Sequence, residues 1–456
     1  MRKILASTLV ALAPAAALAS TPGQVDSGDT AIVLVSAGLV LLMTPGLAFF
    51  YGGLVRAKNV VHTMILSLVC MALVGVLWAL VSYSLAFAPG PAGLDRFIGG
   101  LSFLGLRGVG GEVAKDLAPT VPHAAFMLFQ AMFAVITPAL ISGAIVERVR
   151  IKAFVLFVGI WSIVVYAPVA HWVWAPGGWL RQLGALDFAG GTVVHINAAA
   201  AALVFAIVLG RRRGLKQPSV LPHNVPFAIL GAGLLWFGWL GFNGGSALAA
   251  NGLAAYAFSN TFFAPAAAAL AWGLAELFFF HGKMSGVGLA SGAVAGLVAV
   301  TPAAGFITPL AALGLGAAAG IASLLAVRFR PRLGLDDSLD VFAVHGVAAT
   351  LGALLTGVLA TKAVNPDGAD GSLHLLGVQA VGVLATYLWS GGLSYGIMKL
   401  VDLVTPLRAL EQDEWGGMDI AESGERAYIT ADESAFGQRA EPAPAHAHEL
   451  QRAAAK

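Results

Sequence analysis

The chain has 456 residues, of which 58% are hydrophobic and 11% charged, and its formal net charge is +2. This charged share is about half that of a soluble domain. Many apolar runs approach the roughly 20 residues that cross a bilayer as a helix. The composition therefore excludes a chain made of several soluble domains and predicts one polytopic membrane domain with a short soluble tail. Cys70 is the single cysteine, which excludes an intrachain disulfide and a Cys-cluster metal site.

The first residues differ from the rest of the chain. Residues 1–19, MRKILASTLVALAPAAALA, combine Arg2 and Lys3 with a short apolar core and a small-residue ending. This pattern is typical of a cleaved secretory signal peptide. A first membrane helix is the alternative, but the apolar core is short and Pro14 interrupts it. Cleavage places the mature amino terminus outside the cytoplasm and suggests a bacterium with a periplasm.

Hydropathy predicts eleven membrane-spanning helices within residues 20–404. They lie near 30–52, 60–87, 122–146, 151–173, 191–210, 225–246, 256–280, 286–301, 305–327, 340–362 and 374–403. Because the chain starts outside and the count is odd, the carboxyl terminus is expected inside.

The distribution of Lys and Arg gives an independent test of this orientation. The predicted inner loops hold Arg56, Lys58, Arg148, Arg150, Lys152, Arg211, Arg212, Arg213, Lys216, Lys283, Arg328, Arg330 and Arg332. The predicted outer loops hold only Arg96, Arg107, Lys115, Arg181 and Lys362. The excess on the inner side follows the positive-inside rule and supports the orientation.

The spans divide into two halves of five and a final helix. The first and sixth spans both end in a stretch that combines aromatic residues with glycine, FFYGGLV and GFNGGSAL. Five-helix halves have opposite orientations, so they predict an inverted repeat in which the transported species is handled near the midplane. Fifty-six glycines allow the helices to approach closely.

Two histidines lie inside apolar segments at matching places in the halves. His195 falls in the fifth span and His345 in the tenth, and Asp187 and Asp340 precede them. An imidazole at membrane depth is costly unless it faces a cavity, a partner or a substrate path. One such histidine is more often a satisfied core residue, but a repeat-related pair indicates a polar line through an apolar pore. A metal site is disfavoured because no third ligand has a suitable spacing.

Several long strings resemble the ammonium transporter (Amt/Mep/Rh) family, and its bacterial Amt branch in particular. They are DFAGGTVVHINAA from Asp187, PGLAFFYGGLVRAKN at 45–59, GWLGFNGGS at 238–246, SGAVAGLVAVTPAAG at 291–305 and DVFAVHG at 340–346. The resemblance implies an ammonium transporter that forms a homotrimer, with one pore through each subunit. It also implies that ammonium is deprotonated and that ammonia passes His195 and His345. The route of the proton stays open.

The resemblance further implies an outer vestibule that recruits the ammonium cation. By this match, Phe133 and Trp174 supply aromatic rings, Ser246 supplies a hydroxyl acceptor, and Phe129 lines or supports the vestibule. An aromatic ring attracts a desolvated cation by about 2 kcal/mol. The residues alone leave Trp174 open to a role as an interfacial belt aromatic.

A phenyl gate is implied below the vestibule, where Phe133 and Phe242 match the family's two stacked phenylalanines. Such a gate excludes water and offers no oxygen cage. Potassium would therefore lose its hydration shell without the carbonyl ligands of a potassium channel. Ordinary core packing is the alternative for Phe133.

The remaining expectations concern the ends of the pore and the tail. Asp187 precedes the fifth span, where a carboxylate favours the helix dipole, and the family implies structural support of the site rather than direct contact with ammonium. We expect Asp340 to cap the tenth span in the same way from the cytoplasmic side. Residues 405–430 resemble the family's cytoplasmic regulatory tail, and residues 431–456 have the composition of a disordered segment. A PII-type nitrogen regulatory protein is an implied partner at this face.

Two functions from different classes remain. The leading hypothesis is an ammonium transporter in the inner membrane, and the alternative is an ammonium sensor of the same fold, which would usually carry a signalling module. An intramembrane hydrolase is disfavoured because the spans lack an HExxH motif, a Gly-Ser nucleophile turn and an aspartate pair. We therefore expect no enzymatic activity, no cofactor, no metal and no nucleic-acid partner.

Overall fold

The computed structural model describes residues 23–215, 221–280 and 282–428. The predicted signal peptide (1–19) and the predicted disordered segment (431–456) lie outside the described residues. The described part is mostly helical, and ten of its helical stretches are long and apolar enough to cross a membrane. The prediction of an all-α polytopic chain is therefore confirmed.

The predicted eighth span is shorter than the others. It corresponds to α11 (Gly286–Val300), which is apolar but only 15 residues long. At 1.5 Å per residue, such a helix is about 22 Å long, below the roughly 30 Å of the hydrocarbon core. The count of eleven spans thus stays a prediction.

The elements of the first half extend from Ser27 to Leu209 and include the segment that carries His195. They are α1 (Ser27–Leu54), η1 (Ala57–Asn59), α2 (Val60–Leu77), η2 (Trp78–Ser82), α3 (Tyr83–Phe87), η3 (Leu104–Leu106), β1 (Val113–Ala114), β2 (Ala118–Pro122), α4 (His123–Ile145), α5 (Ile151–Trp161), η4 (Ser162–Tyr166), α6 (Ala167–Trp174), α7 (Trp179–Leu183), η5 (Gly191–Ile196) and α8 (Asn197–Leu209). Of these, η2, η4 and η5 are π-helical turns within longer helices.

The second half and the tail follow. Their elements are α9 (Val225–Gly244), η6 (Gly245–Ala247), α10 (Gly252–Ala275), η7 (Glu276–Phe280), α11, α12 (Pro309–Phe329), η8 (Arg330–Leu333), η9 (Phe342–Val347), α13 (Ala348–Leu359), α14 (Leu373–Asp402), α15 (Glu411–Gly416) and α16 (Met418–Ser423). Here η7 and η9 are π-helical.

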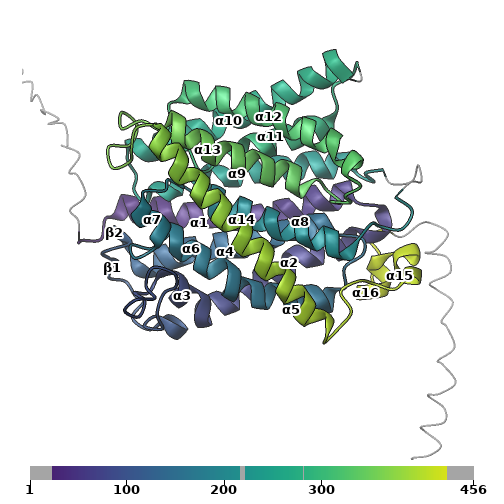
Figure 1. Ribbon diagram of the computed structural model, residues 1–456, viewed down its shortest axis with the longest axis horizontal. Helices are drawn as coiled ribbons and strands as arrows, with labels where there is room; N and C mark the ends of the chain where they lie inside the picture. Colours follow the sequence, from purple (N-terminus) through teal and green to yellow (C-terminus); the bar gives the residue numbers. More distant parts are fainter. Residues whose placement is uncertain (1–22, 216–220, 281, 429–456) are drawn as a thin grey trace, which may run out of the picture.

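The two halves meet where α1 packs along α9. A Cβ added to Gly231 would lie 2.2 Å from the Phe50 amide nitrogen, and one added to Gly53 would lie 2.5 Å from that of Ala228. Glycine is required because the two backbones touch, as in other close membrane-helix contacts. In Figure 1, α9 to α13 form one group, the early helices form another, and α14 crosses both diagonally.

The two ends of the bundle are covered differently. The short antiparallel hairpin β1–β2 lies at one end near α7, and α15 and α16 lie at the other (Figure 1). The tail is held to the helices by hydrogen bonds from the Met418 amide to Asn59 Oδ1, 2.9 Å, and from the His62 amide to Asp419 Oδ1, 2.8 Å. The predicted tail region is thus ordered against the bundle as far as it is described.

Candidate functional site

A cavity of about 160 Å³ opens at the hairpin end of the bundle. Its walls include three of the four side chains expected at the vestibule: Phe133 from α4, Trp174 from the end of α6 and Ser246 from η6. Phe129 is fully buried one turn before Phe133 and does not line the cavity. Its ring packs edge-on against that of Phe133, with the centroids 4.9 Å apart.

Hydrogen bonds fix three of the polar side chains that line this cavity. Trp174 Nε1 donates to the Asp187 carbonyl oxygen at 3.1 Å, and Ser246 Oγ donates to the Phe242 carbonyl oxygen at 2.8 Å. A hydroxyl has one donor and two acceptor lone pairs, so Ser246 keeps acceptor capacity toward the cavity. Arg181 of α7 also lines the cavity and donates to the Trp174 carbonyl oxygen. Sequence reasoning had placed this arginine only in an outer loop.

Phe133, which lines the cavity, packs against a second phenyl ring, that of Phe242. The rings of Phe133 and Phe242 lie 4.3 Å apart, centroid to centroid, with 39° between their planes. Trp174 meets Phe133 nearly perpendicularly at 5.7 Å. Both phenylalanines are buried. Since Phe242 also lies 6.0 Å from the ring of His195, aromatic and imidazole rings form one continuous line.

The histidine pair lies beyond the phenyl rings. His195 Nδ1 and His345 Nδ1 are 3.3 Å apart, and the two imidazole planes differ by 18°. A neutral imidazole has one donor and one acceptor nitrogen, so one ring donates to the other through this contact. In the described part of the chain, His195 Nε2 has no hydrogen-bond partner. That atom is therefore available to another polar group.

Each histidine is carried on a π-helical turn, His195 on η5 and His345 on η9. A π turn adds a residue to the helical repeat and is frequent at functional sites. The ring of His195 also stacks on Trp239 of α9, with the centroids 5.2 Å apart. The pair is thus assembled from three elements of both halves, and each ring has a packed support.

Asp187 supports the start of η5. Its carboxylate accepts hydrogen bonds from the amides of Gly190, Gly191 and Thr192, each at 2.7 Å, and from that of Val193 at 3.2 Å. Gly190 permits this turn because its φ is +114°. Burial raises the pKa of Asp187, and the four amide bonds oppose that effect. Both carboxylate oxygens are therefore engaged by backbone.

Asp337, and not Asp340, has the corresponding place in the second half. The Val341 amide donates to Asp337 Oδ1 at 3.0 Å and the Phe342 amide to Oδ2 at 2.7 Å. Asp340 instead adopts φ +59° and pairs with Arg330 at 2.9 Å. The expected cap at Asp340 is thus wrong. Counting back eight residues from His345, as from His195 to Asp187, would have identified Asp337.

A sequence model described as the Ammonium Transporter Family matches residues 31–428. The chain belongs to this family. It is 49% identical to the ammonium transporter of Bacillus subtilis (strain 168) over 406 residues, which cover 88% of this chain and 98% of that one.

Solved structures agree with the family assignment. The crystal structure of Saccharomyces cerevisiae Mep2 matches with a TM-score of 0.79 and 34% identity, over 85% of this chain and 89% of that one. A structure named Sensor Amt Protein matches with a TM-score of 0.80 and 29% identity, over 87% of this chain and 98% of that one. The fold is thus shared with Mep2 and with a structure that is named for a sensor.

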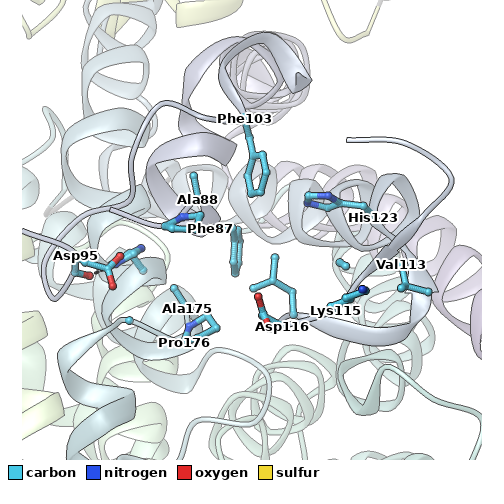
Figure 2. Close-up of a pocket in the computed structure, with 15 residues that line it drawn as sticks. Phe87, Ala88, Asp95, Phe103, Val113, Lys115, Asp116, His123, Ala175 and Pro176 are labelled. Carbon is cyan, nitrogen blue, oxygen red and sulfur yellow. Dashed lines mark hydrogen bonds between the residues drawn. The ribbon is translucent and has the colours of Figure 1, made fainter. Parts of the chain in front are cut away.

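A second pocket adjoins the aromatic cavity at the hairpin end of the bundle. It has a volume of about 330 Å³ and shares Phe87 and Leu117 with the cavity. Figure 2 shows the Phe87 ring near the middle of the pocket, between Phe103 on one side and Pro176 on the other. The hairpin and the helix ends thus create two adjacent hollows that share Phe87 and Leu117 in their walls.

The opposite end carries a buried ion network that sequence reasoning missed. Arg212 bonds Glu147 at 2.9 Å and Asp336 at 2.9 Å, and Arg56 bonds Glu147 at 3.0 Å. Burial opposes ionisation of Glu147, but Arg212 and Arg56 beside it lower its pKa below the ordinary value. The network joins both halves, so Arg212 is more than a positive-inside anchor. In the described residues no group of three potential ligands could hold a metal ion.

Proposed function

We propose that this chain is an ammonium transporter that recruits the cation at the aromatic cavity and conducts ammonia past the histidine pair. The observation that carries the proposal is the continuous line from Trp174 through Phe133 and Phe242 to His195 and His345. Such a line connects a cation-attracting mouth to a narrow polar path inside an apolar bundle. Membership of the ammonium transporter family supports the same function.

Recruitment is proposed to rest on two kinds of contact. The faces of Phe133 and Trp174 attract a cation through their quadrupoles, and Ser246 Oγ accepts one of its N–H groups. Phe129 holds the Phe133 ring in place through its edge-on contact of 4.9 Å. Asp187 acts at a distance, because its carboxylate fixes the turn whose carbonyl oxygen holds Trp174.

Selection is proposed to occur at the Phe133–Phe242 gate. The rings, 4.3 Å apart, leave no oxygen ligands in the path. An intact cation would therefore cross the gate without compensation for lost water. Ammonium has another route, because it can release a proton and continue as neutral ammonia. Potassium has no such route and is excluded.

The histidine pair then offers a polar path for ammonia. Ammonia can donate and accept hydrogen bonds, as can each neutral imidazole. The contact between the two Nδ1 atoms orients both rings, and His195 Nε2 is unpartnered within the described residues. We infer that this nitrogen meets the substrate. Whether the proton travels with each ammonia is decided by the electrical measurement below.

The cellular setting is also part of the proposal. We infer a homotrimer in the inner membrane, with the hairpin end outside and the tail in the cytoplasm, where a PII-type protein docks. The Arg- and Lys-rich end that includes Arg56, Arg148 and Arg212 favours this orientation by the positive-inside rule. We infer in addition a cleaved signal peptide at residues 1–19.

Flux measurements on the purified chain in liposomes test this function. An inward ammonium gradient is expected to change the internal pH and to load the vesicles faster than in protein-free liposomes, while an equal potassium gradient has no effect. A current under the same gradient shows that charge moves with the substrate, and its absence shows neutral transport. Saturable ammonium binding without flux would contradict the transporter and favour the sensor alternative.

A further inference from the structure

Arg181 places a positive charge on the wall of a cavity that we propose recruits cations. It lies on α7 and lines the same cavity of about 160 Å³ as Phe133, Trp174 and Ser246. Its Nη1 group donates to the Trp174 carbonyl oxygen, which orients the guanidinium toward the end of α6. A cation at the mouth of a cation path calls for a physical explanation.

The charge of Arg181 is not balanced locally. In the described chain no carboxylate pairs with its guanidinium. Asp187 is the acid nearest in sequence, and its two oxygens accept amides of η5 instead. A guanidinium stays charged throughout the physiological range of pH. The cavity therefore carries a fixed positive charge beside its aromatic rings.

Two effects follow from this charge. It repels an arriving cation, and because Arg181 is solvent-exposed the repulsion is weakened by water and salt rather than prohibitive. Repulsion also doubles for a divalent cation, whereas the attraction of aromatic rings favours weakly hydrated monovalent ions. In addition, the guanidinium occupies the Trp174 carbonyl, so that this oxygen is less available as a ligand for metal cations.

We propose that Arg181 sets the ammonium affinity of the outer cavity and protects it from divalent cations. This inference rests on the proposed function, since it assumes that the cavity recruits ammonium. Arg181 is a specificity-determining residue in this role: it raises the ammonium concentration at half-maximal flux and leaves the maximal rate, which depends on the gate and the histidine pair, unchanged.

A charge series at one position tests the proposal. Parent, Arg181→Lys, Arg181→Gln and Arg181→Glu are reconstituted in liposomes, and initial flux is measured against ammonium concentration. From a partly screened charge near the site, we expect the KM of Arg181→Gln to fall about two- to fivefold. The KM of Arg181→Glu should fall further, and the KM of Arg181→Lys should stay near the parent value. Millimolar Mg²⁺ should inhibit Arg181→Gln more than the parent.

Arg96→Gln is the matched control, because it removes the same charge from an exposed outer loop without lining the cavity. Its KM should stay at the parent value. An unchanged or raised KM in Arg181→Gln would overturn the proposal, as would an Arg181→Lys variant that behaves like Arg181→Gln, since hydrogen bonding rather than charge would then decide. A parent protein without ammonium flux would instead refute the proposed function itself.

Discussion

Asp187, Gly190 and His195 in the first half have counterparts in Asp337, Asp340 and His345 in the second, with the two histidines 150 residues apart in the chain. In both halves the aspartate caps a π-helical turn that carries the histidine. The residue three positions after the aspartate has a positive φ in both halves, +114° at Gly190 and +59° at Asp340.

The anchors of these two segments nevertheless differ. Asp187 accepts four amides, whereas Asp337 accepts two. The first half fills its left-handed position with glycine, and the second uses a charged residue that pairs with Arg330. Both proposed ends of the pore are thus held by an aspartate that accepts backbone amides, and the proposed inner end adds a second carboxyl, Asp340, at its left-handed position. Four predictions separate these two designs.

The largest effect is expected from removing the outer anchor. In Asp187→Asn the amide oxygen still accepts, but the new NH2 group faces two backbone N–H groups that lose their acceptor. Each unpaired buried donor costs about 1–3 kcal/mol, so two cost about 2–6 kcal/mol, and the Asp187 backbone, whose carbonyl oxygen accepts from Trp174 Nε1, is less firmly held. In Asp337→Asn only one backbone N–H group loses its acceptor. Thermal unfolding in detergent and flux in liposomes should both rank the Asp187 variant lowest; equal losses would contradict the comparison.

The next effect concerns the histidines themselves. Alanine at His195 or His345 removes one half of the pair, and loss of one hydrogen-bonding group along the path should lower ammonium flux about tenfold. The oligomer should remain assembled in size-exclusion chromatography. His374→Ala, an exposed histidine at the start of α14, is the control and should transport normally. Normal flux in either pore variant would remove that histidine from the mechanism.

Some residues of this site could be predicted from sequence motifs, and others could not. His195, His345, Phe133, Phe242 and Trp174 stand in strings whose pattern could be recognised, and they are neighbours in the structure. Asp337 was missed because the aspartate nearest to His345 is Asp340, although the eight-residue spacing from Asp187 to His195 recurs from Asp337 to His345. A helix pattern in the sequence does not reveal a π turn, which shifts the register by one residue.

Other contacts could not be predicted because they join distant segments. Hydropathy predicts which segments enter the membrane, but it does not predict which charged loop residues form ion pairs. The pairing of Arg212 with Glu147 and Asp336 depends on the fold of three loops.

A smaller effect is expected from exchanging the residues at the left-handed positions. Alanine at Gly190 would be strained at φ +114°, and its Cβ would lie 2.7 Å from Val194 Cγ2. We expect a loss of about 1–3 kcal/mol, seen as a lower thermal midpoint. Asp340→Gly relieves a milder strain and loses the Arg330 pair, so it should change stability by less than about 1 kcal/mol.

Gly377→Ala controls this exchange, because no atom lies within 4 Å of the added Cβ and the residue is inside α14. Its thermal midpoint should equal or slightly exceed that of the parent, as expected for alanine in a helix. A Gly190→Ala variant as stable as this control would show that the outer turn does not need glycine, and the contrast between the halves would fail at this position.

The smallest effect is a pH dependence at the left-handed position of the second half, because Asp340 can titrate there and Gly190 cannot. Burial raises the pKa of Asp340 to about 7, while Arg330 opposes the shift and Asp337 adds to it. The folded chain therefore holds a proton that the unfolded chain, with an ordinary value of 3.8, releases. Stability contributed by this proton is complete at the lowest pH, falls as pH rises from about 4 to 7, and is constant above that window.

Thermal midpoints of the parent and of Asp340→Asn, measured from pH 4 to pH 8, isolate this contribution. The midpoint of the parent relative to the variant should decline by a few degrees across the window and then level off; we expect a small change because the Asp340 side chain is 25% exposed and solvent screens its charge. Gly190 has no titrating group, so a Gly190→Ala variant must keep the parent's pH dependence. A difference between parent and Asp340→Asn that is flat with pH would mean that Arg330 keeps the Asp340 carboxylate ionised, and the contrast between the two left-handed positions would not extend to pH dependence.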